Sequence, residues 1–323
     1  MDTLREDYTL TPPELKEILN LSVQGVHHTF KANSIESVLI KRKHRVKSDQ
    51  IRRLFLARGY TYHQEVISFQ VVKGGTGKTS ISHSFAIRAN QYGARVLCID
   101  IDQQGNLTQA FGVDSTDFDT ILDVIKNKQS LNDIILPITP SLHLIPSNMN
   151  NSVLDRYLQV EREPLEYIFT DMLNKVRNQY DYIIFDCPPA ISCANTAATL
   201  ASNRIIIPVN PDKFSMEGLK ITVEEAARLN AKYKKTSPCI NILFNRYDAR
   251  KSSSSEYLKQ LMSNDVYKDL MLNTFIRDNA DISNFIRHKE SIFDSTKNSY
   301  AREDLDLFCR EIMGLDSFAK AIQ

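Results

Sequence analysis

The sequence predicts an α/β protein with a doubly wound, mostly parallel β-sheet, preceded by a small all-α domain. Short apolar runs rich in β-branched residues alternate with helical stretches from residue 65 to residue 276, which is the pattern of βαβ units. Three of the ten glycines, Gly74, Gly75 and Gly77, follow the first such run directly. Residues 1–60 lack these runs, so we expect one domain at 1–62 and a second at 63–323.

The elements of the expected sheet follow in order along the chain. The first strand, residues 65–72, is largely apolar, as a strand buried on both faces requires. Helices are expected after Lys78, ending near Gly93, and at residues 164–179 and 216–234. The other strands are expected at residues 95–100, 142–145, 182–185, 205–209, 240–244 and 271–276.

The N-terminal residues carry the pattern of three short helices. Residues 11–14, Thr-Pro-Pro-Glu, fit a capping box. A turn at Asn20 follows, and Ser22 is placed to cap a second helix over residues 23–30. A third helix is expected at residues 48–58. Two short helices joined by a turn are typical of a helix-turn-helix, which favours DNA binding.

Two sets of N-terminal side chains are candidates for contact with DNA. The second helix is expected to present Ser22, Gln24, His27 and His28 to base edges. The alternative is a solvated basic face on a docking or dimerisation domain, because this helix contains no arginine. A metal site at the two histidines is disfavoured, since no cysteine or carboxylate pair completes it. The basic stretch is expected to contact phosphates through Lys41, Arg42, Lys43, Arg45 and Lys47.

Composition excludes several classes of protein. The chain has 323 residues with 40 Lys and Arg against 39 Asp and Glu, and 42% of them are hydrophobic, as in ordinary globular domains. No apolar run approaches the ~18 residues of a membrane span, and the N-terminus lacks the features of a signal peptide. The five cysteines form no C-x-x-C pair, which disfavours a disulfide framework and a zinc finger. We expect a reduced, soluble, cytoplasmic protein.

The glycine cluster has the composition of a phosphate-binding loop. Residues 73–79 read Lys-Gly-Gly-Thr-Gly-Lys-Thr, between a strand and a helix. Glycines let backbone N–H groups approach a triphosphate, and the helix that follows directs its N-terminal dipole at the anion. Lys78 is expected to reach the β- and γ-phosphates, and the Thr79 hydroxyl to bind Mg²⁺. The alternative is a tight glycine turn with no ligand.

The same loop resembles the deviant Walker A motif of the ParA/MinD family of P-loop ATPases, Lys-Gly-Gly-x-Gly-Lys-Thr. Residues 100–106, Asp-Ile-Asp-Gln-Gln-Gly-Asn, resemble the family's second motif, with Gln103 in its usual proline position. Residues 180–189 resemble its Walker B strand and the following turn. Further blocks at 207–211, 216–219 and 247–250 match in order, so the resemblance covers roughly residues 66–310.

The resemblance implies a P-loop NTPase fold, ATP or ADP with Mg²⁺ as cofactors, and roles for particular residues. Lys73 would cross to the partner's nucleotide in an ATP-sandwich homodimer. Asp102 would orient the attacking water, and Asp186 would hold Mg²⁺ together with Thr79; the alternative for Asp186 is a turn with Pro188. The resemblance implies a larger set of nucleotide contacts at Lys73, Gly74, Gly75, Thr76, Gly77, Lys78, Thr79, Ser80, Asn210, Pro211 and Asn245, the last equally a loop residue.

The branches of this family differ in output, and the sequence favours the DNA branch. The cysteines do not suit a shared iron–sulfur cluster, and the acidic residues 302–311 do not suit membrane binding. The N-terminal extension resembles the helix-turn-helix arm of plasmid-type ParA proteins. Arg250, followed by Lys251, matches a position of non-specific DNA binding, whereas Asp281 stands where a second arginine is expected. The candidate substitutes for it are Arg277, Arg287, His288 and Lys289.

The function implied is that of a weak, Mg²⁺-dependent DNA-partition ATPase. It would dimerise on ATP, bind DNA non-specifically, regulate its own operator and work with a small centromere-binding protein. It would be cytoplasmic and nucleoid-associated, with no membrane partner. The alternative is a nucleotide-regulated transcriptional repressor that moves no cargo.

Overall fold

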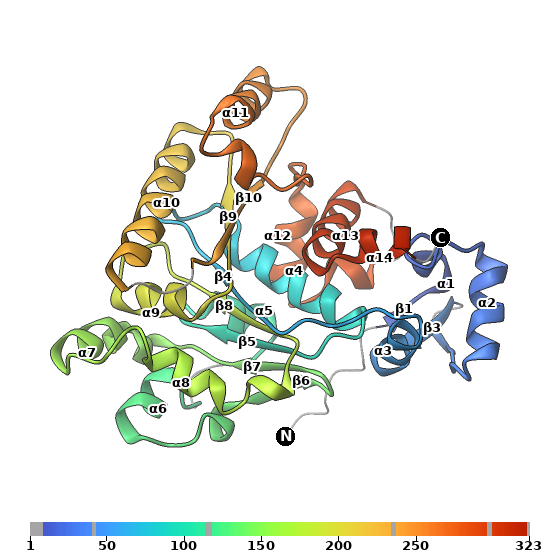
Figure 1. Ribbon diagram of the computed structural model, residues 1–323, viewed down its shortest axis with the longest axis horizontal. Coiled ribbons are helices and arrows are strands. Elements are labelled where there is room, and N and C mark those ends of the chain that lie inside the picture. The colour runs from blue at the N-terminus through green and yellow to red at the C-terminus, as the bar shows by residue number, and fades with distance from the viewer. Residues whose placement is uncertain (1–8, 41–42, 114–117, 234–236, 296–298, 322–323) are drawn as a thin grey trace.

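A seven-stranded sheet forms the centre of the molecule (Figure 1). The computed structural model describes residues 9–40, 43–113, 118–233, 237–295 and 299–321. The strands are arranged in the order β10-β9-β4-β8-β5-β7-β6, and every neighbouring pair is parallel except β6 with β7. Their bounds are β4 (Glu65–Phe69), β5 (Val96–Asp100), β6 (Leu136–Thr139), β7 (Leu142–Ile145), β8 (Tyr182–Asp186), β9 (Arg204–Val209) and β10 (Cys239–Phe244).

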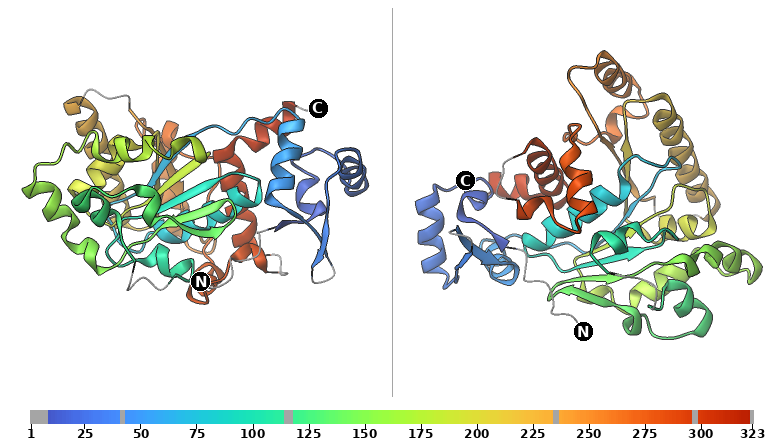
Figure 2. Two further views of the ribbon diagram at one scale, coloured as in Figure 1. Left: turned by 90° about the horizontal axis from the view of Figure 1, so that it is seen from below. Right: turned by 180° about the vertical axis from the view of Figure 1, so that it is seen from behind.

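Helices cover both faces of this sheet, which confirms the predicted doubly wound α/β architecture (Figures 1 and 2). One face packs against α4 (Lys78–Gln91) and α13 (Tyr300–Met313). The other packs against helices between β7 and β9, and α10 (Lys213–Tyr233) covers β9 and β10. The helices between β7 and β9 are α7 (Leu154–Val160), α8 (Ile168–Asn174) and α9 (Cys193–Ala201). The remaining helices include α5 (Asn106–Ala110), α6 (Ile121–Asn127), α11 (Ser252–Ser263), α12 (Ala280–Arg287) and α14 (Leu315–Ala321).

Two expected elements differ from the structure. Residues 271–276 form no strand: within this range only Met271 makes an isolated bridge, with Ile242, and the next bridge joins Tyr247 to Arg277. Single backbone pairs are in register there, and no continuous ladder forms. The long helix expected at 164–179 is shorter, since α8 covers only Ile168–Asn174 and a separate 3-10 turn follows at Arg177–Gln179. Among the described residues, no helix is both long and apolar enough to cross a membrane.

The N-terminal module is not all-α, which corrects the prediction. It contains α1 (Pro12–Leu15), α2 (Val23–Ala32) and α3 (Ser48–Ala57), together with a small antiparallel sheet. That sheet has the order β1-β3-β2, with β1 at Thr9–Leu10, β2 at Val38–Ile40 and β3 at Lys43–Lys47. The basic residues around Val46 conceal the strand pattern, yet Val46 pairs with Leu10 and both side chains are buried. The expected turn at Asn20 (φ 50°) and the Ser22 cap are present.

This module shares one hydrophobic core with the sheet domain. Phe55 of α3 stacks on Tyr92 with ring centres 6.4 Å apart, and Tyr60 packs on Phe318 of α14 at 5.2 Å. The Tyr60 hydroxyl donates to the carbonyl oxygen of Met313 at 2.7 Å. Arg52 of α3 pairs with Asp181 at 2.6 Å. The views from below and behind agree in placing the module beside α13 and α14 (Figure 2).

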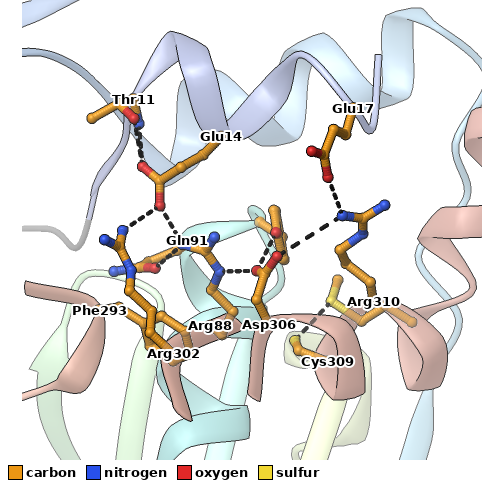
Figure 3. Close-up of polar contacts among 12 residues, drawn as sticks. Thr11, Glu14, Glu17, Arg88, Gln91, Phe293, Arg302, Asp306, Cys309 and Arg310 are labelled. Carbon is orange, nitrogen blue, oxygen red and sulfur yellow. Dashed lines mark hydrogen bonds and ion pairs between the residues drawn. The ribbon is translucent and has the colours of Figure 1, made fainter. Parts of the chain in front are cut away.

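Charged side chains extend the same junction at the C-terminal end of α4 (Figure 3). Arg88, only 3% exposed, donates to Glu14 of α1 at 3.0 Å and to Asp306 of α13 at 2.5 Å. Arg302 reaches the same Glu14 oxygen at 2.7 Å. Burial acts to raise the pKa of Glu14, but Arg88, the Thr11 hydroxyl and Arg302 outweigh it and lower the pKa to about 2. The module is therefore joined to the sheet domain by buried charges as well as apolar contacts.

Candidate nucleotide-binding site

The loop between β4 and α4 has the backbone of a phosphate-binding loop. Gly75 and Gly77 adopt the left-handed region with φ of 75° and 96°, which disfavours residues with a side chain. A Cβ added at Gly77 would also lie 2.7 Å from the amide nitrogen of Asn245. Because α4 begins at Lys78, its first backbone N–H groups and its dipole face the space above the loop. Local geometry and close packing both require glycine at position 77.

The two lysines of the loop lie in different surroundings. Lys78 is only 7% exposed and donates to the Lys73 carbonyl oxygen at 3.3 Å. Its burial lowers its pKa, although nearby Asp186 acts in the opposite direction. The Lys73 ammonium pairs with Asp212 at 2.9 Å. Among the described residues, no ion pair neutralises the Lys78 charge. A buried ammonium whose contact is a carbonyl oxygen is suited to an anionic ligand.

Carboxylates from neighbouring strands lie beside the loop. Asp186 ends β8 and accepts hydrogen bonds from the Thr79 hydroxyl at 2.7 Å and the Ser82 hydroxyl at 3.1 Å. It is in register with Asp100 at the end of β5. Burial raises the pKa of both carboxyl groups, and repulsion by Asp186 adds to the rise at Asp100. Asp102, two residues on, is buried and accepts the Gln104 backbone N–H at 2.9 Å.

Thr79 and Asp186 fit the requirements of a Mg²⁺ ion. Among the described residues, no group of three His, Cys, Asp or Glu is placed to hold a metal. Magnesium in nucleotide sites is commonly bound through one or two carboxylates, substrate phosphates and water. The hydroxyl and the carboxylate are already in contact, so both oxygens face one position beside the phosphate loop.

Two buried amides support the loop from behind. The Asn245 amide donates to the Thr76 carbonyl oxygen at 2.7 Å, and the Asn210 amide donates to the Gly75 carbonyl oxygen at 3.2 Å. Asn245 also lines a cavity next to Gly77, whereas Asn210 and Pro211 line neither of the two cavities over the loop. Their expected contact with adenine stays a prediction.

Two adjoining cavities open over the loop. The larger, of about 840 Å³, contains the loop glycines, Lys78, Thr79 and Asp102. The smaller, of about 340 Å³, is lined by Asn245, Arg250 and Asn279, and the two share Gly77, Ser80 and Arg246. Such volumes are those of small-ligand sites. Sequence reasoning missed Arg246, whose φ of 56° turns it into the left-handed region; its only signal is the position directly after Asn245.

The expected DNA contacts are divided between two places. Ser22, Gln24, His27 and His28 are all exposed on α2 and its cap, and Lys43 is exposed on β3, where Arg45 is half-buried. Lys41 and Arg42 lie outside the described residues. On the sheet domain, Arg250 is 89% exposed and pairs with Asp248 at 2.9 Å, and Lys251 pairs with the same carboxylate at 3.6 Å. The N-terminal set and the Arg250 set are not brought together.

The candidate substitutes for the absent arginine differ among themselves. Arg277 is held by buried Asp304, with Nε 2.9 Å from one carboxylate oxygen, and by Glu303 at 2.9 Å. Those ion pairs occupy its guanidinium, which argues against a role in binding DNA. Arg287 and Lys289 are exposed and line the larger cavity. Asp281 lies in the first turn of α12, where an acidic side chain suits the helix dipole.

Comparison with known proteins places this site in a family. A family model described as an AAA domain matches residues 64–237. The chain is 32% identical over 243 residues to the cell division protein PomZ of Myxococcus xanthus, covering 75% of each chain. It is 27% identical over 246 residues to the chromosome-partitioning ATPase Soj of Treponema pallidum, covering 76% of this chain and 95% of the relative.

Solved structures share the fold. A point variant of McdA from Cyanothece, in complex with ATP, has a TM-score of 0.71 at 21% identity, covering 79% of this chain and 98% of that one. A putative plasmid partition protein of Borrelia burgdorferi bound to AMPPNP has a TM-score of 0.61 at 23% identity, covering 76% and 97%. Together with the phosphate loop and its two lysines, these matches lead to one conclusion: the chain belongs to the family of ParA-type partition ATPases.

Proposed function

We propose that this protein is a Mg²⁺-dependent ATPase that dimerises on ATP and carries DNA or a DNA-bound cargo. The observation that carries the proposal is the contact of Thr79 with Asp186 at 2.7 Å, directly beside the glycine loop and the buried Lys78. In this arrangement backbone N–H groups and one ammonium face the phosphates. The hydroxyl and carboxylate face a Mg²⁺ that, when bound, neutralises charge on the phosphate oxygens.

The residues divide the work of hydrolysis. Lys78 binds the β- and γ-phosphates, and Asp102 orients the attacking water from its buried position beside the loop. Lys73 contributes from the partner subunit in an ATP-sandwich homodimer, where an added cation stabilises charge that shifts during phosphoryl transfer. A catalytic lysine that must arrive from a second subunit is consistent with a weak ATPase.

We also propose two DNA-binding surfaces. Exposed His27 and His28 on α2, with the basic hairpin of β2 and β3, would bind operator DNA. Arg250 and Lys251 would contact phosphates of any sequence. A small centromere-binding protein would be the partner for cargo movement, and the protein would act in the cytoplasm on the nucleoid.

A second candidate is a nucleotide-regulated repressor that moves no cargo. The observation in its favour is the buried contact of Arg88, on the helix that starts at the phosphate loop, with Glu14 of the N-terminal module. A helix with one end at the nucleotide and the other at the DNA-binding module is a direct route for nucleotide to set operator affinity.

The deciding experiment measures DNA binding with no nucleotide, ADP, ATP and a slowly hydrolysed ATP analogue. Each state is tested on operator and on random duplex at two salt concentrations. Partition predicts that ATP promotes binding to random duplex, and that Asp102→Ala prolongs it because hydrolysis is slow. Repression predicts a nucleotide effect on operator alone. The matched control, Lys78→Ala, is expected to remove every nucleotide effect, and a nucleotide effect that survives in it contradicts both functions.

A further inference from the structure

Lys73 of the phosphate loop is held on its own subunit by a carboxylate to which no role has been assigned. Asp212 precedes α10, and its Oδ1 lies 2.9 Å from the Lys73 ammonium. The exposed Phe214 ring lies beside the same ammonium, with its centre 5.5 Å away. The Lys73 carbonyl oxygen accepts a hydrogen bond from the Lys78 ammonium. The backbone of Lys73 therefore stays with the phosphate loop while its side chain faces α10.

The Asp212 carboxylate is fixed in place by other contacts. The backbone N–H of Ser215 donates to its Oδ1 at 2.9 Å, and the Ser215 hydroxyl donates to its Oδ2 at 2.9 Å. Partial burial acts to raise the pKa of Asp212, but the hydrogen bonds from Lys73 and Ser215 outweigh it and lower the pKa. The carboxylate is therefore a prepared anionic partner at the start of a helix.

A glycine allows the helix to approach the lysine. A Cβ added at Gly218 of α10 would lie 3.2 Å from the Lys73 Cβ. That separation is tighter than ordinary van der Waals contact, so a larger residue at 218 would push α10 and the loop apart. Gly218 thus brings the start of α10, and with it Asp212, within reach of Lys73.

We propose that Asp212 is a positioning residue that holds the Lys73 side chain on its own subunit. It thereby restrains ATP-dependent dimerisation until the ion pair breaks. This inference rests on the proposed function, in which Lys73 reaches the nucleotide of the partner subunit. One ammonium then has two competing anions: Asp212 in the monomer and the partner's phosphates in the dimer. Both protomers must release their lysine, so the restraint is applied twice in each dimer.

The size of the restraint follows from the exposure of the pair. Both side chains are about one-third exposed, with fractions of 30% and 38%. An ion pair of this kind shifts an equilibrium by about 1.4- to 5-fold. Two pairs per dimer therefore raise the apparent dimer dissociation constant by roughly 2- to 25-fold.

The test uses Asp212→Asn in the full chain, because the asparagine oxygen still accepts the Ser215 N–H while the charge is lost. Sedimentation with a slowly hydrolysed ATP analogue measures the dimer dissociation constant. The ATPase rate, followed against protein concentration, gives the concentration at which the rate is half-maximal. We expect both to fall by roughly 2- to 25-fold, as the exposed ion pair predicts, with the rate at saturating protein little changed. Asp212→Ser, another helix cap, is expected to act alike.

Controls separate this role from a structural one. Glu217→Gln removes a charge from the same helix, where Glu217 lies 3.9 Å from Lys213 and is not paired with Lys73, and it is expected to change nothing. In a Lys73→Ala background, Asp212→Asn is expected to give no gain. An unchanged or raised dissociation constant in Asp212→Asn, or a gain that persists without Lys73, overturns the proposal. A wild-type chain that forms no dimer with the analogue overturns the proposed function itself.

Discussion

The two ends of helix α4 hold buried cations that serve different purposes. At its start, Lys78 is 7% exposed and meets a carbonyl oxygen beside an open cavity. At its end, Arg88 is 3% exposed and meets two carboxylates, with the rings of Tyr92 and Phe293 within 5 Å. Burial lowers the pKa of Lys78. Burial acts in the same direction on the pKa of Arg88, but Asp306, Tyr92 and Glu14 outweigh it and raise that pKa.

This difference separates a cation that awaits a ligand from one that completes the fold. Taking a charge out of water is costly unless a partner of opposite charge replaces the water. Arg88 has its partners within the chain. Lys78 forms no ion pair with the other described residues, and a bound phosphate would supply one. We therefore expect substitutions at the two ends to differ in effect: loss of stability at one and loss of ligand binding at the other.

The largest effect is expected from removing the N-terminal module. Deletion of residues 1–62 takes away Phe55 and Tyr60, which pack on Tyr92 and Phe318, and it leaves Arg88 without Glu14. We therefore expect loss of soluble, cooperatively folded protein, measured by urea unfolding and by sedimentation. Two separate domains at 1–62 and 63–323, as expected from the sequence, would instead leave the truncated chain folded. Deletion of residues 1–47 keeps α3 on the sheet domain and is expected to be milder; equal stability of both truncations with full-length protein contradicts the shared core.

Loss of nucleotide binding is the next effect in size. Lys78→Ala removes the buried ammonium at the floor of the larger cavity, so we expect ATP affinity to fall by at least about 100-fold, as for a lost buried charge pair. Stability without nucleotide is expected to be unchanged or higher, because a buried charge that has no ion pair with any described residue is gone. Calorimetric titration and urea unfolding measure the two. Ser84→Ala, on the same helix and lining neither cavity, serves as the control for binding.

Glu14 provides a stability change that depends on pH. Its pKa falls from 4.5 to about 2 on folding, so the stabilisation is fully present above pH 4.5 and is lost as the pH falls toward 2. A shift of this size corresponds to about 3 kcal/mol. We expect Glu14→Gln to lower the free energy of unfolding by about that amount at pH 7 and to flatten its decline below pH 5. Glu17→Gln is the control, because Glu17 is 63% exposed and pairs with Arg310 at the surface; an equal effect of both substitutions contradicts the buried-pair account.

The smallest effect is expected at the exposed Arg250. Arg250→Ala removes one phosphate contact, which weakens binding to random duplex about uniformly over sequence and lowers the salt slope by about one. The pKa of Asp248 is lowered by its hydrogen bonds from Arg250, yet the Arg250 side chain is 89% exposed, so stability is expected to change little. Mobility shifts at two salt concentrations measure the change. Arg228→Ala, an exposed arginine paired with Glu225, is the control, and an unchanged slope in Arg250→Ala contradicts a DNA contact there.

The phosphate loop was predictable because its signals are local. Three glycines, two lysines and two threonines fill the seven positions 73–79. Their roles follow from the local backbone conformation and from the start of the next helix. The strands around the loop were predictable for a similar reason, since apolar runs of five or six residues bury themselves in any parallel sheet. The strands of the N-terminal module were not, because basic residues interrupt the apolar pattern around Val46.

By itself, the sequence determined the family, the sheet and the glycine loop of the candidate nucleotide-binding site. Only the tertiary structure decided which distant groups those residues touch: Asn245 on Thr76, Asp212 on Lys73 and Glu14 on Arg88, separated by 169, 139 and 74 positions. The packing of whole helices and strands sets such contacts. The sequence around either residue of a pair therefore does not indicate which distant residue is its partner. The same packing turned an expected independent arm into part of the core, because the apolar faces of α3 and α4 are buried against each other and not against water.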